Sequence, residues 1–200
     1  MNVTSREASA PRRKGDVMRH TMAIIFLLAL AGGIYFYNTI WFQATFKDDF
    51  INEISYEPFD VTKKGAALSL PIKYRYNTCY KLAIAVPDKN VFHHHIVGPG
   101  ILKYRFVSNG RVIAEGRTFE AQKQNLMYSL GITSINILVF NLPFPGAGGD
   151  LTLELEVLEP MTFLEPYTGN TYCKINPDYD PKFCKCYNED LMIPQQAAGN

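Results

Sequence analysis

The chain has 200 residues, in which 20 Lys and Arg balance 19 Asp and Glu to give a formal net charge of +1. This balance provides neither the basic field that attracts nucleic acid nor an acidic tail, so we predict no nucleic-acid partner. Hydrophobic residues make up 47% and aromatic residues 13% of the chain. This composition excludes disorder throughout the chain and allows one packed domain with additional segments.

A long uncharged stretch lies near the N-terminus. Residues 21–42 read TMAIIFLLALAGGIYFYNTIWF and contain no Asp, Glu, Lys or Arg. A helix of this length spans the roughly 30 Å hydrocarbon core of a bilayer. Aromatic residues gather towards its C-terminal end, as is typical of a membrane interface. We therefore predict a transmembrane helix over 21–42 that has the lipid bilayer as its partner.

The charges that flank this stretch predict its orientation. The preceding segment, 1–20, is basic, with Arg6, Arg12, Arg13, Lys14 and Arg19, whereas Lys47, Asp48, Asp49 and Glu53 follow the stretch. By the positive-inside rule, the N-terminus stays in the cytoplasm and the remainder is exported. We predict a single-pass protein of a bacterial inner membrane, with its C-terminal domain in the periplasm.

A cleaved signal peptide is the alternative to a retained anchor. Ala29-Leu30-Ala31 is an acceptable cleavage site because it has small residues on either side of a leucine. However, the apolar stretch continues for about eleven residues beyond Ala31, which is more typical of a spanning helix than of a signal peptide. The sequence therefore favours the retained anchor.

Residues 58–160 have the pattern of antiparallel strands, since short β-branched and aromatic runs alternate with Gly, Pro, Asn and Asp. The runs cover 67–74, 80–86, 101–119, 129–142 and 151–158. Asn109-Gly110 interrupts the third run and predicts a hairpin, because Asn-Gly favours a type I′ turn. Parallel strands would need crossover helices, for which there is no room. We predict an all-β fold, an antiparallel β-sandwich that is Ig-like or jelly-roll-like, after a juxtamembrane linker over 43–57.

Part of this region resembles a known family. Residues 58–65 (PFDVTKKG), followed by an alternating strand and then YKLAI at 80–84, are similar to the opening of an uncharacterised bacterial family of periplasmic proteins and lipoproteins. That family is catalogued as a domain of unknown function (DUF5625-like), and the similarity covers Tyr56 to Glu159. The resemblance implies an exported β-sandwich without a known activity. The chain differs in having an apolar helix in place of a lipidated Cys and in its Cys-containing tail, so no functional residue is transferred.

The C-terminal tail, 161–200, is rich in Pro, Tyr, Asn and Asp and contains Cys173, Cys184 and Cys186, while Cys79 begins a predicted strand. An even number of cysteines in an exported chain favours disulfides. Cys184 and Cys186 are too close to pair with each other. The pairing is therefore either Cys173–Cys184 with Cys79–Cys186, or Cys173–Cys186 with Cys79–Cys184. A zinc site is the alternative, although the C-x-C spacing matches poorly with structural zinc sites.

Two further groups of residues suggest metal binding. His93-His94-His95 lies in a predicted loop, where His93 and His95 would share one side of an extended segment and could bind a transition metal. Solvated loop histidines explain the same pattern. Asp178 and Asp180 could offer oxygen ligands to calcium, but a turn after Asn176-Pro177 explains them equally. We predict no cofactor.

The predicted function is non-catalytic binding, because the sequence contains no recognisable catalytic constellation. We predict a membrane-anchored interaction module of the cell envelope, whose partner is an envelope protein or a glycan. One alternative is an exported metal-binding protein that uses His93–His95 and the tail cysteines. Another is an accessory subunit of a membrane complex, since Gly32-Gly33 would allow close packing of the anchor helix.

Overall fold

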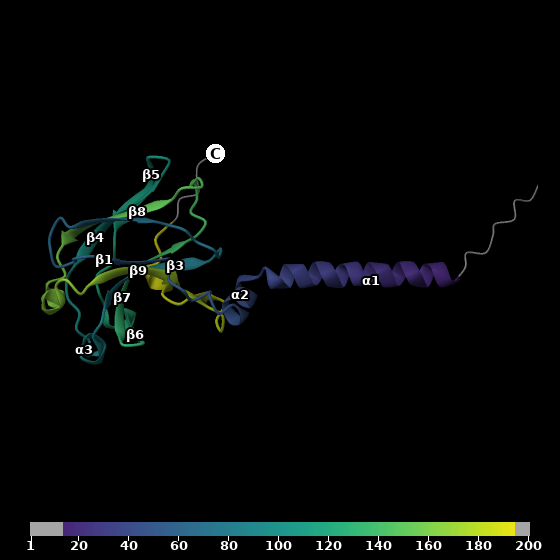
Figure 1. The fold of residues 1–200 in the computed structure, drawn as a ribbon, viewed down its shortest axis with the longest axis horizontal. Coiled ribbons are helices and arrows are strands. Elements are labelled where there is room, and N and C mark those ends of the chain that lie inside the picture. The colour runs from purple at the N-terminus through teal and green to yellow at the C-terminus, as the bar shows by residue number, and fades with distance from the viewer. Residues whose placement is uncertain (1–13, 195–200) are drawn as a thin grey trace, which may run out of the picture.

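The apolar N-terminal stretch forms helix α1 (Lys14–Tyr37), which projects as a rod from the remainder of the chain in the computed structural model (Figure 1). The structure describes residues 14–194, so most of the basic segment predicted over 1–20 lies outside the described residues. Met18–Tyr37 is long and apolar enough to cross a membrane, with a mean hydropathy of 1.7. Signal sequences can have the same length and composition.

The predicted helix over 21–42 is divided in two. Asn38 Nδ2 donates a hydrogen bond to Ile34 O (2.8 Å), and Thr39 Oγ1 donates one to Phe36 O (2.7 Å). The Thr39 hydroxyl also accepts from the Phe42 N–H (3.2 Å) and so caps a second helix, α2 (Ile40–Phe46). Asn and Thr side chains compete in this way for backbone hydrogen bonds, which ends α1 at Tyr37, before Trp41 and Phe42.

Two antiparallel sheets pack face to face, which confirms the predicted all-β sandwich behind one apolar helix (Figure 1). The five-stranded sheet has the order β1 (Ser55–Pro58), β9 (Tyr172–Pro177), β3 (Cys79–Val86), β7 (Ile132–Asn141), β6 (Leu126–Ser129). The four-stranded sheet has the order β2 (Ala67–Pro71), β8 (Thr152–Glu159), β4 (Ile101–Ser108), β5 (Arg111–Arg117). The remaining elements are the hairpin of β10 (Tyr179–Asp180) and β11 (Lys185–Cys186), the helix α3 (Lys89–His93), and the 3₁₀ helices η1 (Lys123–Asn125), η2 (Thr162–Tyr167) and η3 (Glu189–Leu191).

The β4–β5 hairpin forms as predicted. Asn109 has a φ of 50° and Gly110 a φ of 71°, the left-handed conformations that a type I′ turn requires at both central residues. Across the sandwich, Phe106 of this hairpin packs against Phe140 of β7, with ring centroids 4.9 Å apart. The hairpin thus contributes a core side chain of the four-stranded sheet that packs directly against the five-stranded sheet.

The sandwich extends beyond the predicted range of 58–160 at both ends. Strand β9 comes from the predicted tail, yet it lies between β1 and β3 and pairs antiparallel with both. Its Cys173 and Ile175 side chains are fully buried in the core. The tail therefore supplies an interior strand, and the linker supplies the edge strand β1.

We expect Ile175→Ala to lower the free energy of unfolding by about 2–5 kcal/mol, as for other large-to-small core substitutions. Urea unfolding followed by circular dichroism measures this change. Leu130→Ala is the control, because Leu130 is 98% exposed and its truncation should change stability by less than about 0.5 kcal/mol. Equal effects of the two substitutions would contradict an interior position for β9.

Candidate functional site

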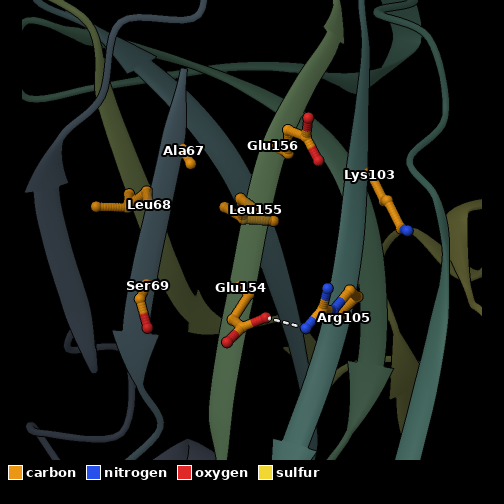
Figure 2. Close-up of a pocket in the computed structure, with 8 residues that line it drawn as sticks. All are labelled: Ala67, Leu68, Ser69, Lys103, Arg105, Glu154, Leu155 and Glu156. Atoms are coloured by element: carbon orange, nitrogen blue, oxygen red, sulfur yellow. Dashed lines mark ion pairs between the residues drawn. The ribbon is translucent and has the colours of Figure 1, made fainter. Parts of the chain in front are cut away.

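The outer face of the four-stranded sheet carries a shallow hollow of about 390 Å³ (Figure 2). Its lining comes from β2, β4 and β8 and consists of Ala67, Leu68, Ser69, Lys103, Arg105, Glu154, Leu155 and Glu156. The edge strand β2 contributes the short side chains of Ala67 and Ser69 to this part of the outer face, beside long charged side chains on its neighbours. This difference in side-chain length produces the hollow.

Strand register arranges the charged residues of this face in two rows. One row runs Ser69, Glu154, Arg105, Glu115 across the four strands, and the next runs Ala67, Glu156, Lys103, Arg117. Alternate residues of a strand point to the same face, so all eight share the outer side. We call these two rows the charged rows.

Ion pairs occupy part of the charged rows. Arg105 Nη2 lies 2.9 Å from Glu154 Oε2, and Lys103 Nζ lies 3.4 Å from Glu115 Oε2. The paired side chains are 37–56% exposed, and pairs this exposed add little stability, about 0–1 kcal/mol. A binding partner can therefore rearrange these pairs at small cost.

Other groups on this face are unpaired within the part of the chain that the structure describes. Arg105 Nε is buried without a hydrogen-bond partner, and Glu156 makes no ion pair. Buried polar groups in proteins are nearly always hydrogen-bonded, so an unpaired one calls for a partner. The hollow thus offers the Glu156 carboxylate directly, whereas Arg105 Nε is itself buried and its guanidinium is engaged by Glu154.

The pattern of each strand by itself does not reveal this site, because the charged rows form only across several strands. The available signal was the alternation of charge in residues 103–105 (KYR) and 154–156 (ELE). Pairing those two segments in register would have opposed a base to each acid.

The structure brings together two of the four candidate cysteines. Cys79 and Cys186 form a disulfide with their Cα atoms 6.1 Å apart, one bond of the first predicted pairing. The second bond of that pairing is not formed, because Cys173 lies in the core while Cys184 is exposed. Burial raises the pKa of the Cys173 thiol far above its usual range, which keeps it protonated and unreactive.

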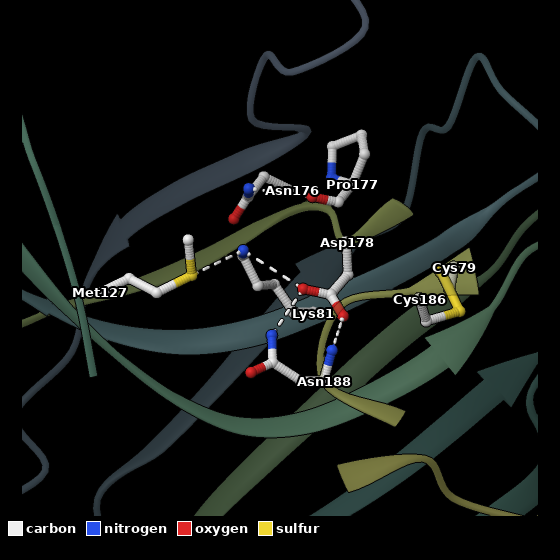
Figure 3. A network of polar contacts seen from close by, with 8 residues as sticks. All are labelled: Cys79, Lys81, Met127, Asn176, Pro177, Asp178, Cys186 and Asn188. Carbon is white, nitrogen blue, oxygen red and sulfur yellow. Dashed lines mark hydrogen bonds and ion pairs between the residues drawn. A yellow bond between two sulfur atoms is a disulfide. The ribbon is translucent and has the colours of Figure 1, made fainter. Parts of the chain in front are cut away.

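A buried ion pair lies beside the disulfide and joins the tail to β3 (Figure 3). Lys81 Nζ is 3.2 Å from Asp178 Oδ1, and the two side chains are only 8% and 0% exposed. Asn188 donates to both Asp178 oxygens, at 2.7 and 2.8 Å. Burial lowers the pKa of Lys81, and the Asp178 carboxylate opposes that shift. Because Asp178 is buried and fully bonded, it does not present oxygen ligands to calcium.

The candidate metal ligands do not form one site. The segment with His93 and His95 follows the C-terminal end of β3, whereas the disulfide lies at its first residue, Cys79. His93 ends α3 instead of lying on an extended segment, and both rings contact aromatic side chains. Within residues 14–194, no group of three or more His, Cys, Asp or Glu is placed to hold a metal ion.

Comparison with known proteins gives little further information. No family model and no curated protein matches the chain. A crystal structure of a protein from Sulfurospirillum deleyianum, designated GEBA250068378, is similar with a TM-score of 0.48 and 12% sequence identity. The similarity covers 64% of this chain and 99% of that chain, and at this level it identifies no function.

The buried ion pair generates a stability prediction. We expect Asp178→Ala to lower the free energy of unfolding by about 3–5 kcal/mol at pH 7, because Lys81 is left buried without a counter-charge. Combining it with Lys81→Met should recover more than half of the loss, since the uncompensated charge is then removed. Glu189→Ala is the control, because it breaks only the exposed pair with Lys185. Urea unfolding measures these changes in the free energy of unfolding. A loss for Asp178→Ala as small as that for the control would argue against a buried pair.

Proposed function

We propose that the chain is a membrane-tethered interaction module, anchored by α1 in a bacterial inner membrane with its sandwich in the periplasm. The module binds another envelope protein through the hollow on its four-stranded sheet. The observation that carries this proposal is the pair of charged rows on an open sheet face, in which weak exposed ion pairs lie beside the unpaired Glu156 carboxylate. Such a face suits a protein surface with complementary alternating charges.

The junction after α1 supports retention of the anchor. Phe50 is 2% exposed and packs on the Tyr76 ring at 5.0 Å, and Tyr76 donates to Asp49 at 2.6 Å. The anchor thus continues into the domain through bonded residues instead of a free linker. Cleavage after Ala31 would leave the side chains of Tyr35 and Phe36, 77% and 49% exposed, at a free N-terminus in water.

The lining of the hollow favours a protein over a glycan. Sugar rings usually stack on aromatic side chains, whereas the described residues that line this hollow include no aromatic ring. Instead they offer charged groups of both signs beside small residues. A peptide segment with its own Lys or Glu side chains matches this chemistry better than a neutral sugar.

Site-specific photo-crosslinking in the native membrane tests the proposal. We expect a probe at Ser69 to give a protein adduct, and the pair swap Arg105→Glu with Glu154→Arg to reduce its yield by about tenfold or more, equivalent to about 1.4 kcal/mol. The swap keeps an ion pair, so the melting temperature should stay unchanged. The swap Lys174→Glu with Glu53→Lys is the matched control, because it inverts an ion pair on the five-stranded sheet.

The other outcomes distinguish the alternatives. An adduct that glycosidases remove would indicate a glycan. Adducts from a probe at Gly33 but not at Ser69 would indicate that the anchor helix, as part of a membrane complex, makes the contact. Equal loss of the Ser69 adduct in both swaps would reject the charged rows as the binding surface.

A further inference from the structure

The β10–β11 hairpin and the residue after it expose large aromatic side chains. Phe183 and Tyr187 are each 61% exposed. Lys182 Nζ lies 5.3 Å from the centre of the Phe183 ring, whereas Lys185 of the same hairpin is paired with Glu189 at 3.1 Å. Aromatic rings accompanied by lysines are typical of surfaces at the boundary between lipid and water, where rings enter the headgroup layer and ammonium groups meet phosphates.

This hairpin lies at the end of the sandwich from which the anchor leaves. The disulfide fastens β11 to Cys79, the first residue of β3. A depression of about 400 Å³ is lined jointly by Ile40 of α2 and by Cys184 and Lys185 of the hairpin. In Figure 1 the hairpin, drawn in yellow, accordingly appears beside α2, on the side of the sandwich that faces α1.

A second segment exposes apolar side chains at the same end. Trp41 and Phe46 of α2 are 37% and 59% exposed, and Ile51 just beyond it is 73% exposed. The rings of Trp41 and Phe46 lie 6.0 Å apart. Two segments far apart in sequence therefore present large apolar groups around the base of α1, a distribution that a bilayer would cover from one side.

We propose that the β10–β11 hairpin is a second membrane contact, in which Phe183 and Tyr187 enter the interfacial layer of the bilayer that holds α1 and Lys182 faces lipid phosphates. This inference rests on the membrane anchoring in the proposed function. The bilayer is the favoured occupant because α1, when inserted, holds the hairpin next to the lipid surface. The disulfide and the Lys81–Asp178 pair then keep the aromatic side chains in place.

Fluorescence quenching by brominated lipids tests this contact in the full chain. The protein has a single Trp, so Trp41→Phe provides a background in which one new Trp reports its own position. After reconstitution into vesicles of phosphatidylglycerol and phosphatidylcholine brominated near the headgroup, we expect Phe183→Trp to be quenched by about twofold or more, as for an interfacial residue.

Two further variants serve as controls. Phe26→Trp lies within α1 and should be quenched by bromine at depth. Leu130→Trp should not be quenched, because Leu130 precedes β7, whose last residue Asn141 lines the depression near α2. A ten-residue strand spans about 33 Å, which places Leu130 about a strand's length from that depression.

The outcomes separate this inference from the proposed function. Quenching of Phe183→Trp and Phe26→Trp but not of Leu130→Trp supports the second contact. Quenching of Phe26→Trp alone overturns it while membrane anchoring stands. No quenching of Phe26→Trp rejects the anchoring itself. Protection of Phe183→Trp from both brominated lipid and aqueous acrylamide would indicate coverage by a second copy of the chain and would also overturn the membrane contact.

Discussion

The structure depends on the complete burial of strand β3. All eight of its residues are buried. The strand therefore needs a paired strand along each edge, the hydrophobic core against one face, and other residues that shield its opposite face from solvent. Its edges pair with β7 and β9. Unpaired backbone groups at such a depth would each cost about 1–3 kcal/mol. The chain therefore has to return after β8 and insert β9, which makes the tail part of the sandwich.

The tail is rich in polar residues and Cys because it covers the face of β3 that points away from the core. Alternation sends Tyr80 and Leu82 into the core and Lys81 to the opposite side. A lysine there is tolerable only with a buried counter-charge, and Asp178 provides it from the segment directly after β9. The polar and Cys-containing residues that follow thus neutralise and cover the strand instead of forming a separate unit.

Features of the fold were predictable from the sequence where one segment of the chain contains all of their determinants. The β4–β5 hairpin was predictable because Asn109-Gly110 has a strong local turn preference, and β8 because Leu and Glu alternate. Strand β9 was missed because its six residues include Lys174, Asn176 and Pro177, which suggest a loop when read alone. The break between α1 and α2 at Asn38 was not predicted, because it lies within an uncharged run. The hollow was unpredictable because it requires the register of several strands together.

The position of α1 relative to the sandwich determines the direction in which the hollow faces. The two sheets are stacked across the direction in which α1 extends (Figure 1), so the outer face of the four-stranded sheet points sideways from the α1 axis instead of along it. In the proposed function, a partner on this face would lie beside the domain, at a similar height above the membrane. If α1 alone held the domain there, rotation about the helix axis would be free, and binding would have to remove that freedom at an entropic cost. A second contact through Phe183 and Tyr187 would restrict the rotation beforehand, so the charged rows would already face along the membrane plane when a partner arrives.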